Sequence, residues 1–399
     1  MFDPGSVKVR GPLRAHVEGF WAELLRQGYA PLSARNLLLV AAHLGRWLQA
    51  NRLGLRELTE DRAAAFLRHR RRQGYTHFCA RRGLDPLLLY LRSVGAVPIP
   101  EPIIDDSPVG RLVREYATYL ERERGLVASS VRQRTAFARW FIRHERPRLD
   151  WDRLTPVEIT RFVLDRSRRS SIAGRKSLVT LLRSFLRFLH VRGATADHLA
   201  SCVPAVAGWR LAAVPQALEA RDIARLLASF DRTPVGRRDA AIVRLLVRLG
   251  LRAGEVAALA LHHVDWRSGE ITVQGKGRHE SRLPLPDDVG RALAAYLRHG
   301  RQRAAARSLF LRSRAPYRGM RPGTVMAVAQ RALRRAGVVA GGAHLLRHTA
   351  ATQLLRRGAS LPEIAHVLRH RHLDTTAIYA KVDLDSLGAL VRPWPEVAP

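Results

Sequence analysis

Arginine, lysine, histidine and tyrosine side chains that together could break a phosphodiester bond occur along the last part of this 399-residue sequence. Without a metal ion, that reaction needs cations at the non-bridging oxygens and a nucleophile. It also needs a group that takes the nucleophile's proton and an acid for the leaving oxygen. The candidates for these roles are Arg252, Glu255, Lys276, His344, Arg347, His370 and Tyr379.

Arg252 lies in the stretch Gly250-Leu251-Arg252-Ala253-Gly254-Glu255, which predicts a turn between two apolar helices. An arginine at such a junction can present its planar guanidinium to a phosphate while its stem packs. Glu255 could cap the second helix or orient that guanidinium. In a chain so rich in arginine, a solvated surface position is the ordinary alternative for any single one.

Lys276 stands at the centre of Gly275-Lys276-Gly277, the predicted tip of a β-hairpin over residues 269–285. The chain has only four lysines, at positions 8, 176, 276 and 381. A lysine kept on a glycine-flanked turn favours a role that arginine cannot fill, because lysine can donate a proton and arginine stays charged. A surface lysine without function is the alternative.

His344 and Arg347 lie three residues apart on a predicted helix that follows Gly341-Gly342, so both can reach one phosphate. His344 and His348, four apart, could instead suggest zinc. No glutamate follows the first histidine, and no third ligand is obvious, so a metal site is disfavoured.

Tyr379 follows His370 by nine residues, across a helix predicted to begin at Asp374. A tyrosine in such a helix is usually a core or capping aromatic. As a nucleophile at neutral pH, its phenol would need phosphate-bound cations nearby.

Taken in order, these motifs resemble those of the tyrosine recombinase (phage integrase) family over about residues 215–391. The matching elements are Gly-Leu-Arg-x-Gly-Glu, Gly-Lys-Gly, His-Leu-Leu-Arg-His-Thr and the ending Thr-Thr-x-x-Tyr. The resemblance implies that Arg252 and Arg347 hold the scissile phosphate. His344 and His370 would support it by hydrogen bonds, and His344 would also manage the proton of Tyr379.

The same resemblance implies that Tyr379 forms a 3′-phosphotyrosyl link while Lys276 protonates the departing 5′-oxygen, without cofactor, metal or ATP. Glu255 would be the acidic residue that orients the site. Four protomers would act on two sites of double-stranded DNA, with related recombinases as further candidate partners. The segment after Tyr379 could dock onto a neighbouring copy.

Two features depart from the family pattern. Arg369 stands where glycine is common, and it could add a phosphate contact or reshape the turn. The first segment looks like a second core-binding bundle, with two roles open to it: to lengthen the DNA footprint or to contact protein instead. Two alternatives remain at this point: a catalytically silent DNA-binding accessory protein, and a type IB topoisomerase.

The composition agrees with a nucleic-acid partner. The formal net charge is +34, with 68 Lys+Arg against 34 Asp+Glu, and the excess extends over the whole chain. Only Cys79 and Cys202 are present, and no apolar run is long enough to cross a bilayer. We therefore expect a cytoplasmic protein without a disulfide framework, without a secretory signal and without membrane contact.

Proline-rich stretches at residues 97–108 and 202–215 divide the chain. The predicted domains are a helical core-binding-like bundle (residues 1–97), a helical core-binding domain (105–205) and a catalytic domain with a tail (213–395). Residues repeat between the first two at offsets of 96 to 98, for example Gly28 with Gly125, which suggests a duplication. The predicted fold class is mainly α, with a small antiparallel sheet in the last domain.

Overall fold

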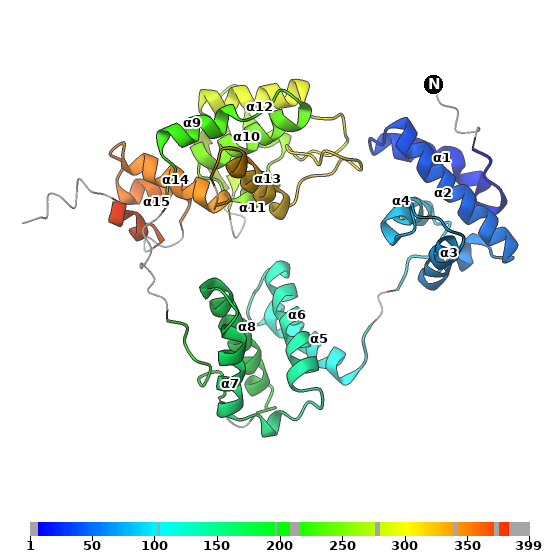
Figure 1. Ribbon diagram of the computed structural model, residues 1–399, viewed down its shortest axis with the longest axis horizontal. Coiled ribbons are helices and arrows are strands. Elements are labelled where there is room, and N and C mark those ends of the chain that lie inside the picture. Colours follow the sequence, from blue (N-terminus) through cyan, green and yellow to red (C-terminus); the bar gives the residue numbers. More distant parts are fainter. Residues whose placement is uncertain are drawn as a thin grey trace, which may run out of the picture. The chain divides into compact units, whose positions relative to one another are not determined.

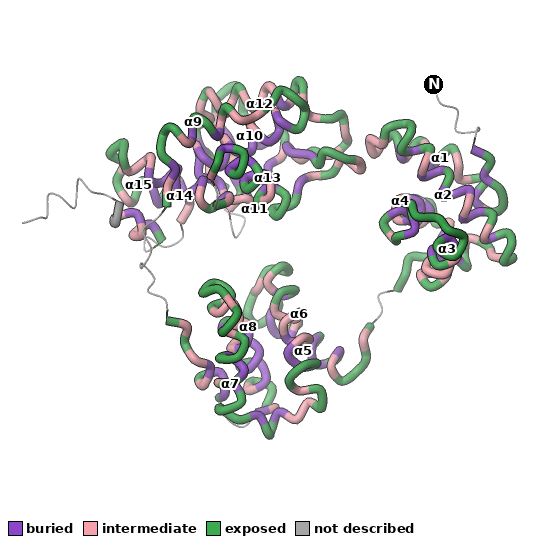
Figure 2. The backbone as a smooth tube through the Cα atoms, in the orientation of Figure 1, coloured by how far each residue is buried: buried purple, intermediate pink, exposed green. Residues whose placement is uncertain are grey.

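The computed structural model describes residues 7–101, 104–195, 198–207, 216–275, 280–338, 341–370 and 375–382 (Figure 1). By proximity of Cα atoms the chain forms two compact units. One comprises residues 1–100 and 213–399, and the other residues 101–212. Buried residues form a separate hydrophobic core inside each helical group (Figure 2). The domain boundaries given above remain predictions.

The first helical group is built around α2, whose buried residues recur at helical spacing from Ala34 to Leu48. Phe20 of α1, Phe66 of α3 and Leu91 of α4 pack into the same core. Its elements are η2 Gly11–His16, α1 Val17–Arg26, α2 Pro31–Ala50, η3 Leu55–Glu57, α3 Glu60–Arg72 and α4 Arg81–Ser93.

The second helical group has an aromatic core, in which Tyr116, Phe141, Phe185 and Phe188 lie together. Its last buried residue is Val203, so the start of the proline-rich stretch at 202–215 packs against the bundle. The elements are α5 Pro108–Arg122, α6 Ala128–Glu145, η4 Trp151–Arg153, α7 Pro156–Ser167 and α8 Ile172–Val191.

The two groups repeat the same order of elements, as the sequence offset predicts. The short helices η3 and η4 lie 96 residues apart, and each is followed by a helix that a threonine caps, Thr59 or Thr155. Positive backbone φ angles also recur in pairs: Gly28 with Gly125, Gly95 with Gly193, and the non-glycine residues Arg52 with Leu149. A left-handed residue is uncommon outside glycine, so its recurrence at the same place supports the duplication.

The last part of the chain surrounds α10, in which every residue from Ala241 to Val247 except Arg244 is fully buried. Three short strands form an antiparallel sheet in the order β1-β2-β3, with Ile271 opposite Leu283 as the hairpin prediction requires. The elements are α9 Ala220–Ala228, α10 Pro234–Arg248, α11 Ala253–Ala258, η5 Leu261–His263, β1 Val264–Asp265, β2 Glu270–Gln274, β3 Glu280–Pro284, α12 Asp287–His299, α13 Pro322–Arg335, α14 Ala343–Leu355, α15 Leu361–Leu368 and η7 Ala377–Val382.

The fold-class prediction is confirmed, since helices dominate and the sheet is small and antiparallel. The helix expected to begin at Asp374 is observed as the 3-10 helix η7, while Asp374 itself lies outside the described residues. Within the described part of the chain, no helix has the length and apolar character needed to span a membrane.

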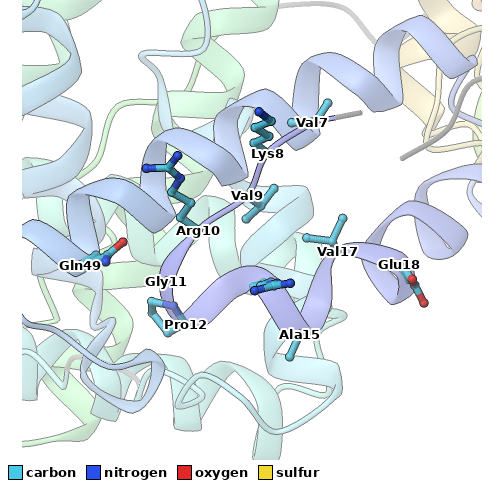
Figure 3. Close-up of a pocket in the computed structure, with 11 residues that line it drawn as sticks. Val7, Lys8, Val9, Arg10, Gly11, Pro12, Ala15, Val17, Glu18 and Gln49 are labelled. Atoms are coloured by element: carbon cyan, nitrogen blue, oxygen red, sulfur yellow. The ribbon is translucent and has the colours of Figure 1, made fainter. Parts of the chain in front are cut away.

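A cavity of about 1230 Å³ lies beside the first described residues and shares no lining residue with the candidate catalytic set (Figure 3). Its wall combines the apolar Val7 and Val9 with the cations of Lys8 and Arg10, and Gln49 of α2 closes one side. Arg252, Arg347 and His370 instead lie where α10 and α15 end and where α11 and α14 begin.

Candidate active site

Arg252 is the N-cap residue of α11, and Glu255 holds it there. The carboxylate of Glu255 accepts from the Arg252 backbone N–H over 2.8 Å and from its Nη1 over 2.7 Å. Glu255 therefore both caps the helix and orients the guanidinium, the two roles considered from the sequence. The Arg252 side chain remains 40% exposed whereas that of Glu255 is 4% exposed, so a ligand can reach the arginine.

Arg347 projects from the first turns of α14 and is 6% exposed. Its Nη1 donates to the carbonyl oxygen of Gly250, two residues after α10, and its Nη2 donates to that of Leu368, the last residue of α15. Burial, followed by the positive charge of Arg252, lowers the pKa of Arg347 to about 10, so it remains a cation at neutral pH. One side chain thus joins three helices.

Gly250 permits this convergence. Its φ of +59° is a conformation in which a β-carbon is unfavourable. A β-carbon there would also lie 2.5 Å from Cδ2 of Leu368. The close approach brings the end of α15, and with it His370, toward Arg252 and Arg347.

Arg369 ends α15 in the left-handed conformation, with φ +55° and ψ +48°. Its side chain is 8% exposed, and its Nη2 donates to Oε2 of Glu255 over 2.8 Å. Its own carbonyl oxygen accepts from Nη2 of Arg252 over 3.3 Å. Of the two effects expected for this departure from glycine, a phosphate contact is disfavoured because the guanidinium is engaged with Glu255, and the backbone has the left-handed conformation that glycine also adopts.

Glu255 consequently lies between two arginines. Burial disfavours its charge, but Arg369 and the hydrogen bonds from Arg252 outweigh burial and place its pKa below the usual value. Arg252, Arg347 and Arg369 against this one carboxylate leave a net charge of +2 in the cluster. The pentacoordinate state of an attacked phosphodiester gains negative charge, which such a cluster can stabilise.

His370 follows Arg369 and is fixed by two hydrogen bonds. Its backbone N–H donates to the Ala365 carbonyl oxygen over 2.9 Å, and its Nδ1 lies 2.7 Å from Oγ1 of Thr376. Burial and the neighbouring cations, first Arg347 and then Arg252, lower the pKa of His370 to about 4. The imidazole is therefore neutral at pH 7.

Tyr379 lies on η7, buried to 2% exposure among Ala351, Ile364 and Leu368. Its phenol oxygen is 2.8 Å from Nδ1 of His348 on α14. Burial raises the pKa of the phenol, and Arg347 opposes that shift in part. The tyrosine is thus protonated at neutral pH, and it lies close enough to Arg347 to feel its charge.

His348 is the residue that sequence reasoning missed, because its role was considered only for zinc. Burial, His344 and Arg347 lower its pKa, so it is neutral near pH 7 and can accept a proton. The available signal was its position next to Arg347 and one helical turn after His344, which places it on the same side of α14.

Of the two remaining predicted residues, only His344 is described by the structure. His344, one turn before His348, is exposed at the start of α14. Lys276 lies in residues 276–279, outside the described part of the chain, between β2 and β3. Among the described residues, no group of three His, Cys, Asp or Glu side chains has an arrangement suited to a metal ion.

Comparisons with known proteins show which chains this one is similar to. Residues 216–385 match the model of the Phage integrase family. A protein of Sinorhizobium fredii named "Putative integrase/recombinase y4rA" is 40% identical over 394 residues, covering 96% of this chain and 95% of that protein. A protein named "Tyrosine recombinase XerC" of Oceanobacillus iheyensis is 34% identical over 238 residues, covering 55% of this chain and 72% of that protein.

Solved structures of recombinases are also similar to this chain, and one example covers most of it. The XerH site-specific recombinase bound to palindromic difH substrate, in a post-cleavage complex, has a TM-score of 0.54 and 18% identity. The match covers 91% of this chain and 97% of that one. This similarity shows that the two chains share a fold.

Proposed function

The chain belongs to the phage integrase family of tyrosine recombinases, enzymes that cut and rejoin DNA, and on that premise we propose that Tyr379 is the nucleophile. The phenol oxygen attacks phosphorus, and the bond from phosphorus to the 5′-oxygen breaks. The DNA 3′ end becomes joined to Tyr379, which conserves the energy of the phosphodiester for religation.

The observation that carries the proposal is the proximity of Tyr379 to the buried Arg347, whose positive charge acts on the pKa of the phenol. Arg347 lies on α14 and joins the ends of α10 and α15, and η7 packs against α14 and α15. The phenol therefore belongs to the same small volume as the cation cluster, although 32 residues separate Tyr379 from Arg347 in sequence. Cations next to a phenol favour its ionisation as the proton leaves.

Arg252 and Arg347 hold the scissile phosphate in this proposal. Arg252 is the more exposed of the two, so its guanidinium can donate two hydrogen bonds to the phosphate. Arg347 supplies a fixed, buried positive charge. His344 and His370 add hydrogen bonds to the phosphate oxygens, and Glu255 keeps Arg252 in position. Lys276, on the hairpin between β2 and β3, protonates the departing 5′-oxygen.

The proton of Tyr379 passes to a neutral histidine. His348 is hydrogen-bonded to the phenol, so we assign it as the first acceptor of that proton. His344, which the family resemblance favours for this task, is the exposed residue available to DNA. When Nδ1 of His348 carries no proton, the phenol donates to it, and attack on phosphorus can proceed as the proton transfers.

The partner is double-stranded DNA, and strand exchange brings four protomers onto two DNA sites in the cytoplasm. The helical bundles at residues 1–97 and 105–205 supply DNA-binding surfaces. The chain after residue 382 is proposed to dock onto a neighbouring copy. Related recombinases are further candidate members of the assembly.

A suicide substrate tests the proposal. A nicked duplex whose cleaved strand loses a short fragment traps the covalent complex, which migrates slowly in a denaturing gel. The parent chain forms this complex, and Tyr379→Phe does not. Tyr90→Phe, which removes a half-exposed phenol from α4, is the matched control and behaves like the parent. A complex that persists with Tyr379→Phe excludes Tyr379 as the nucleophile. Relaxation of a plain supercoiled plasmid would instead indicate topoisomerase activity.

A further inference from the structure

The loop over residues 73–80, which joins α3 to α4, lies between two helix ends that are rich in arginine. From Arg62 to Leu84 the sequence contains seven arginines and two histidines and no aspartate or glutamate. All loop residues except Cys79 are exposed. A surface of this charge attracts a polyanion.

Arginines from α3 fix the shape of this loop. Arg71 donates from Nε and Nη2 to the Cys79 carbonyl oxygen over 3.2 and 2.8 Å, and Arg70 donates from Nη2 to the His77 carbonyl oxygen over 3.1 Å. The guanidinium of Arg70 also lies over the ring of Tyr75, 4.3 Å from its centroid. These contacts tie the backbone of the loop to α3.

The loop exposes two aromatic rings. Tyr75 is 40% exposed and Phe78 is 38% exposed. Phe78 has a φ of +55°, which is unfavourable for a bulky residue. A β-carbon on Gly83 would lie 3.1 to 3.2 Å from Phe78, so the glycine in the first turn of α4 makes room for it. Strain of this kind concentrates at functional sites.

The bundle fold does not require the loop. Gly95 corresponds to Gly193 at an offset of 98, so residues 74–80 correspond to residues 172–178. In the second group these residues form the first two turns of α8, a regular helix capped by Ser171. The first group has replaced those turns with an irregular segment, at the cost of helical hydrogen bonds.

The arginines around the loop divide into two sets. Arg81 and Arg92 pair with the carboxylate of Glu60, and Arg81 also pairs with Asp85. Arg68, Arg72 and Arg82 are exposed, and none forms an ion pair within the described part of the chain. These three cations therefore remain free to meet phosphates beside the rings.

We propose that the loop over residues 73–80 is a second DNA-binding site, remote in sequence from the catalytic residues. Arg68, Arg72 and Arg82 contact phosphates of duplex DNA, and Phe78 packs its ring against bases and sugars in a groove. Apolar side chains are used in this way by proteins that bind the minor groove. Through this site the first helical group would extend the enzyme's footprint on DNA.

Binding of the full chain to a labelled random-sequence duplex tests the site without any cleavage step, so the role of Tyr379 does not affect the outcome. Phe78→Gly removes the ring and suits the positive φ, so folding is preserved. Its affinity should fall about tenfold, in keeping with the loss of one buried phenylalanine ring from the interface. Because no charge is lost, the salt dependence should keep its slope.

Arg72→Gln should change the salt dependence that Phe78→Gly leaves unchanged. Loss of one phosphate contact lowers the magnitude of the slope of log affinity against log salt concentration by about 0.9. Arg52→Gly is the matched control, because Arg52 is another exposed residue with positive φ in the same bundle, and it should keep most of the affinity. Parental affinity for Phe78→Gly together with a parental slope for Arg72→Gln would overturn the proposal.

A photocrosslinking residue provides a direct readout. Phe78→p-benzoylphenylalanine should crosslink to the duplex on irradiation, whereas the same residue at the exposed position Leu89 of α4 should not. Single-stranded RNA of equal length should compete poorly. A crosslink that RNA removes but duplex DNA does not would contradict duplex DNA as the ligand.

Discussion

Arg369 donates from Nη2 to Oε2 of Glu255, 114 residues earlier in the chain, over 2.8 Å. Glu255 also accepts from Arg252, so Arg369 supplies the charge that keeps one carboxylate from neutralising the phosphate-binding arginine. Arg369→Gly keeps a backbone suited to φ +55° but lowers the cluster's net charge by one. We expect its DNA cleavage rate in a single turnover to fall about tenfold, which corresponds to about 1.4 kcal/mol in the transition state.

Two further variants distinguish the effect of the Arg369 charge on cleavage from the effect of losing any ion pair. Arg369→Lys retains the charge but not the planar fork, so its rate should lie between those of the parent and Arg369→Gly. Arg356→Ala breaks the exposed pair with Glu219 and should cleave like the parent. A parental rate for Arg369→Gly, in a variant whose unfolding transition is intact, would mean that Arg369 does not affect the site.

We expect His348 to accept the proton of Tyr379 during cleavage. His348→Ala leaves the phenol without this acceptor, so single-turnover cleavage at pH 7 should slow about a hundredfold, a usual effect for loss of a general base. Added imidazole should restore part of the rate. His366→Ala, an exposed histidine of α15, is the control. If His348→Ala cleaves at the parental rate while His344→Gln is slow, the proton passes to His344 instead.

His370 makes stability depend on pH. Its pKa in the folded chain is about 4, whereas an unfolded histidine titrates near about 6.5. Between these values the unfolded state binds more protons, so the free energy of unfolding decreases as the pH falls from 6.5 toward 4. His370→Gln should lose less stability than the parent between pH 6.5 and pH 5 in urea unfolding, and the exposed control His299→Gln should follow the parent. Equal losses in all three would exclude this titration.

Lys276 is predicted to be the general acid. Lys276→Ala should cleave slowly and bind DNA with nearly parental affinity, since a proton donor acts on the leaving oxygen rather than on binding. A substrate with sulfur in place of the 5′-bridging oxygen needs no acid, so it should restore the rate of the variant. Lys8→Ala should cleave both substrates like the parent. Failure of the sulfur substrate to restore the rate would contradict the assignment.

The sequence was sufficient for the parts of the fold and site that depend on local pattern. Alternating Ile271 and Val273 predicted the hairpin, which is observed, and glycine at position 250 predicted the turn that presents Arg252. The recurrence of positive φ at Arg52 and Leu149 supports a duplication inferred from scattered identities. Such features are determined by residues close together in sequence, so hydrophobic periodicity and turn-forming residues are enough to predict them.

The remaining features depend on contacts between distant segments. The pairing of Glu255 with Arg369 and that of His348 with Tyr379 require α14 and α15 to pack against the ends of α10 and α11. Spacing along a helix shows which side chains share a face, but not which partner the packing brings to that face. Arg369 was therefore considered for a phosphate contact, and His348 only for zinc.

The most direct test identifies the amino acid that carries the DNA. The parent chain is trapped on a suicide duplex, digested with protease and nuclease, and the nucleotide-bearing peptide is sequenced by mass spectrometry. We predict a single modified residue, Tyr379, carrying the phosphate of a 3′ end. A phosphate on another residue, or attachment through a 5′ end, would contradict the account.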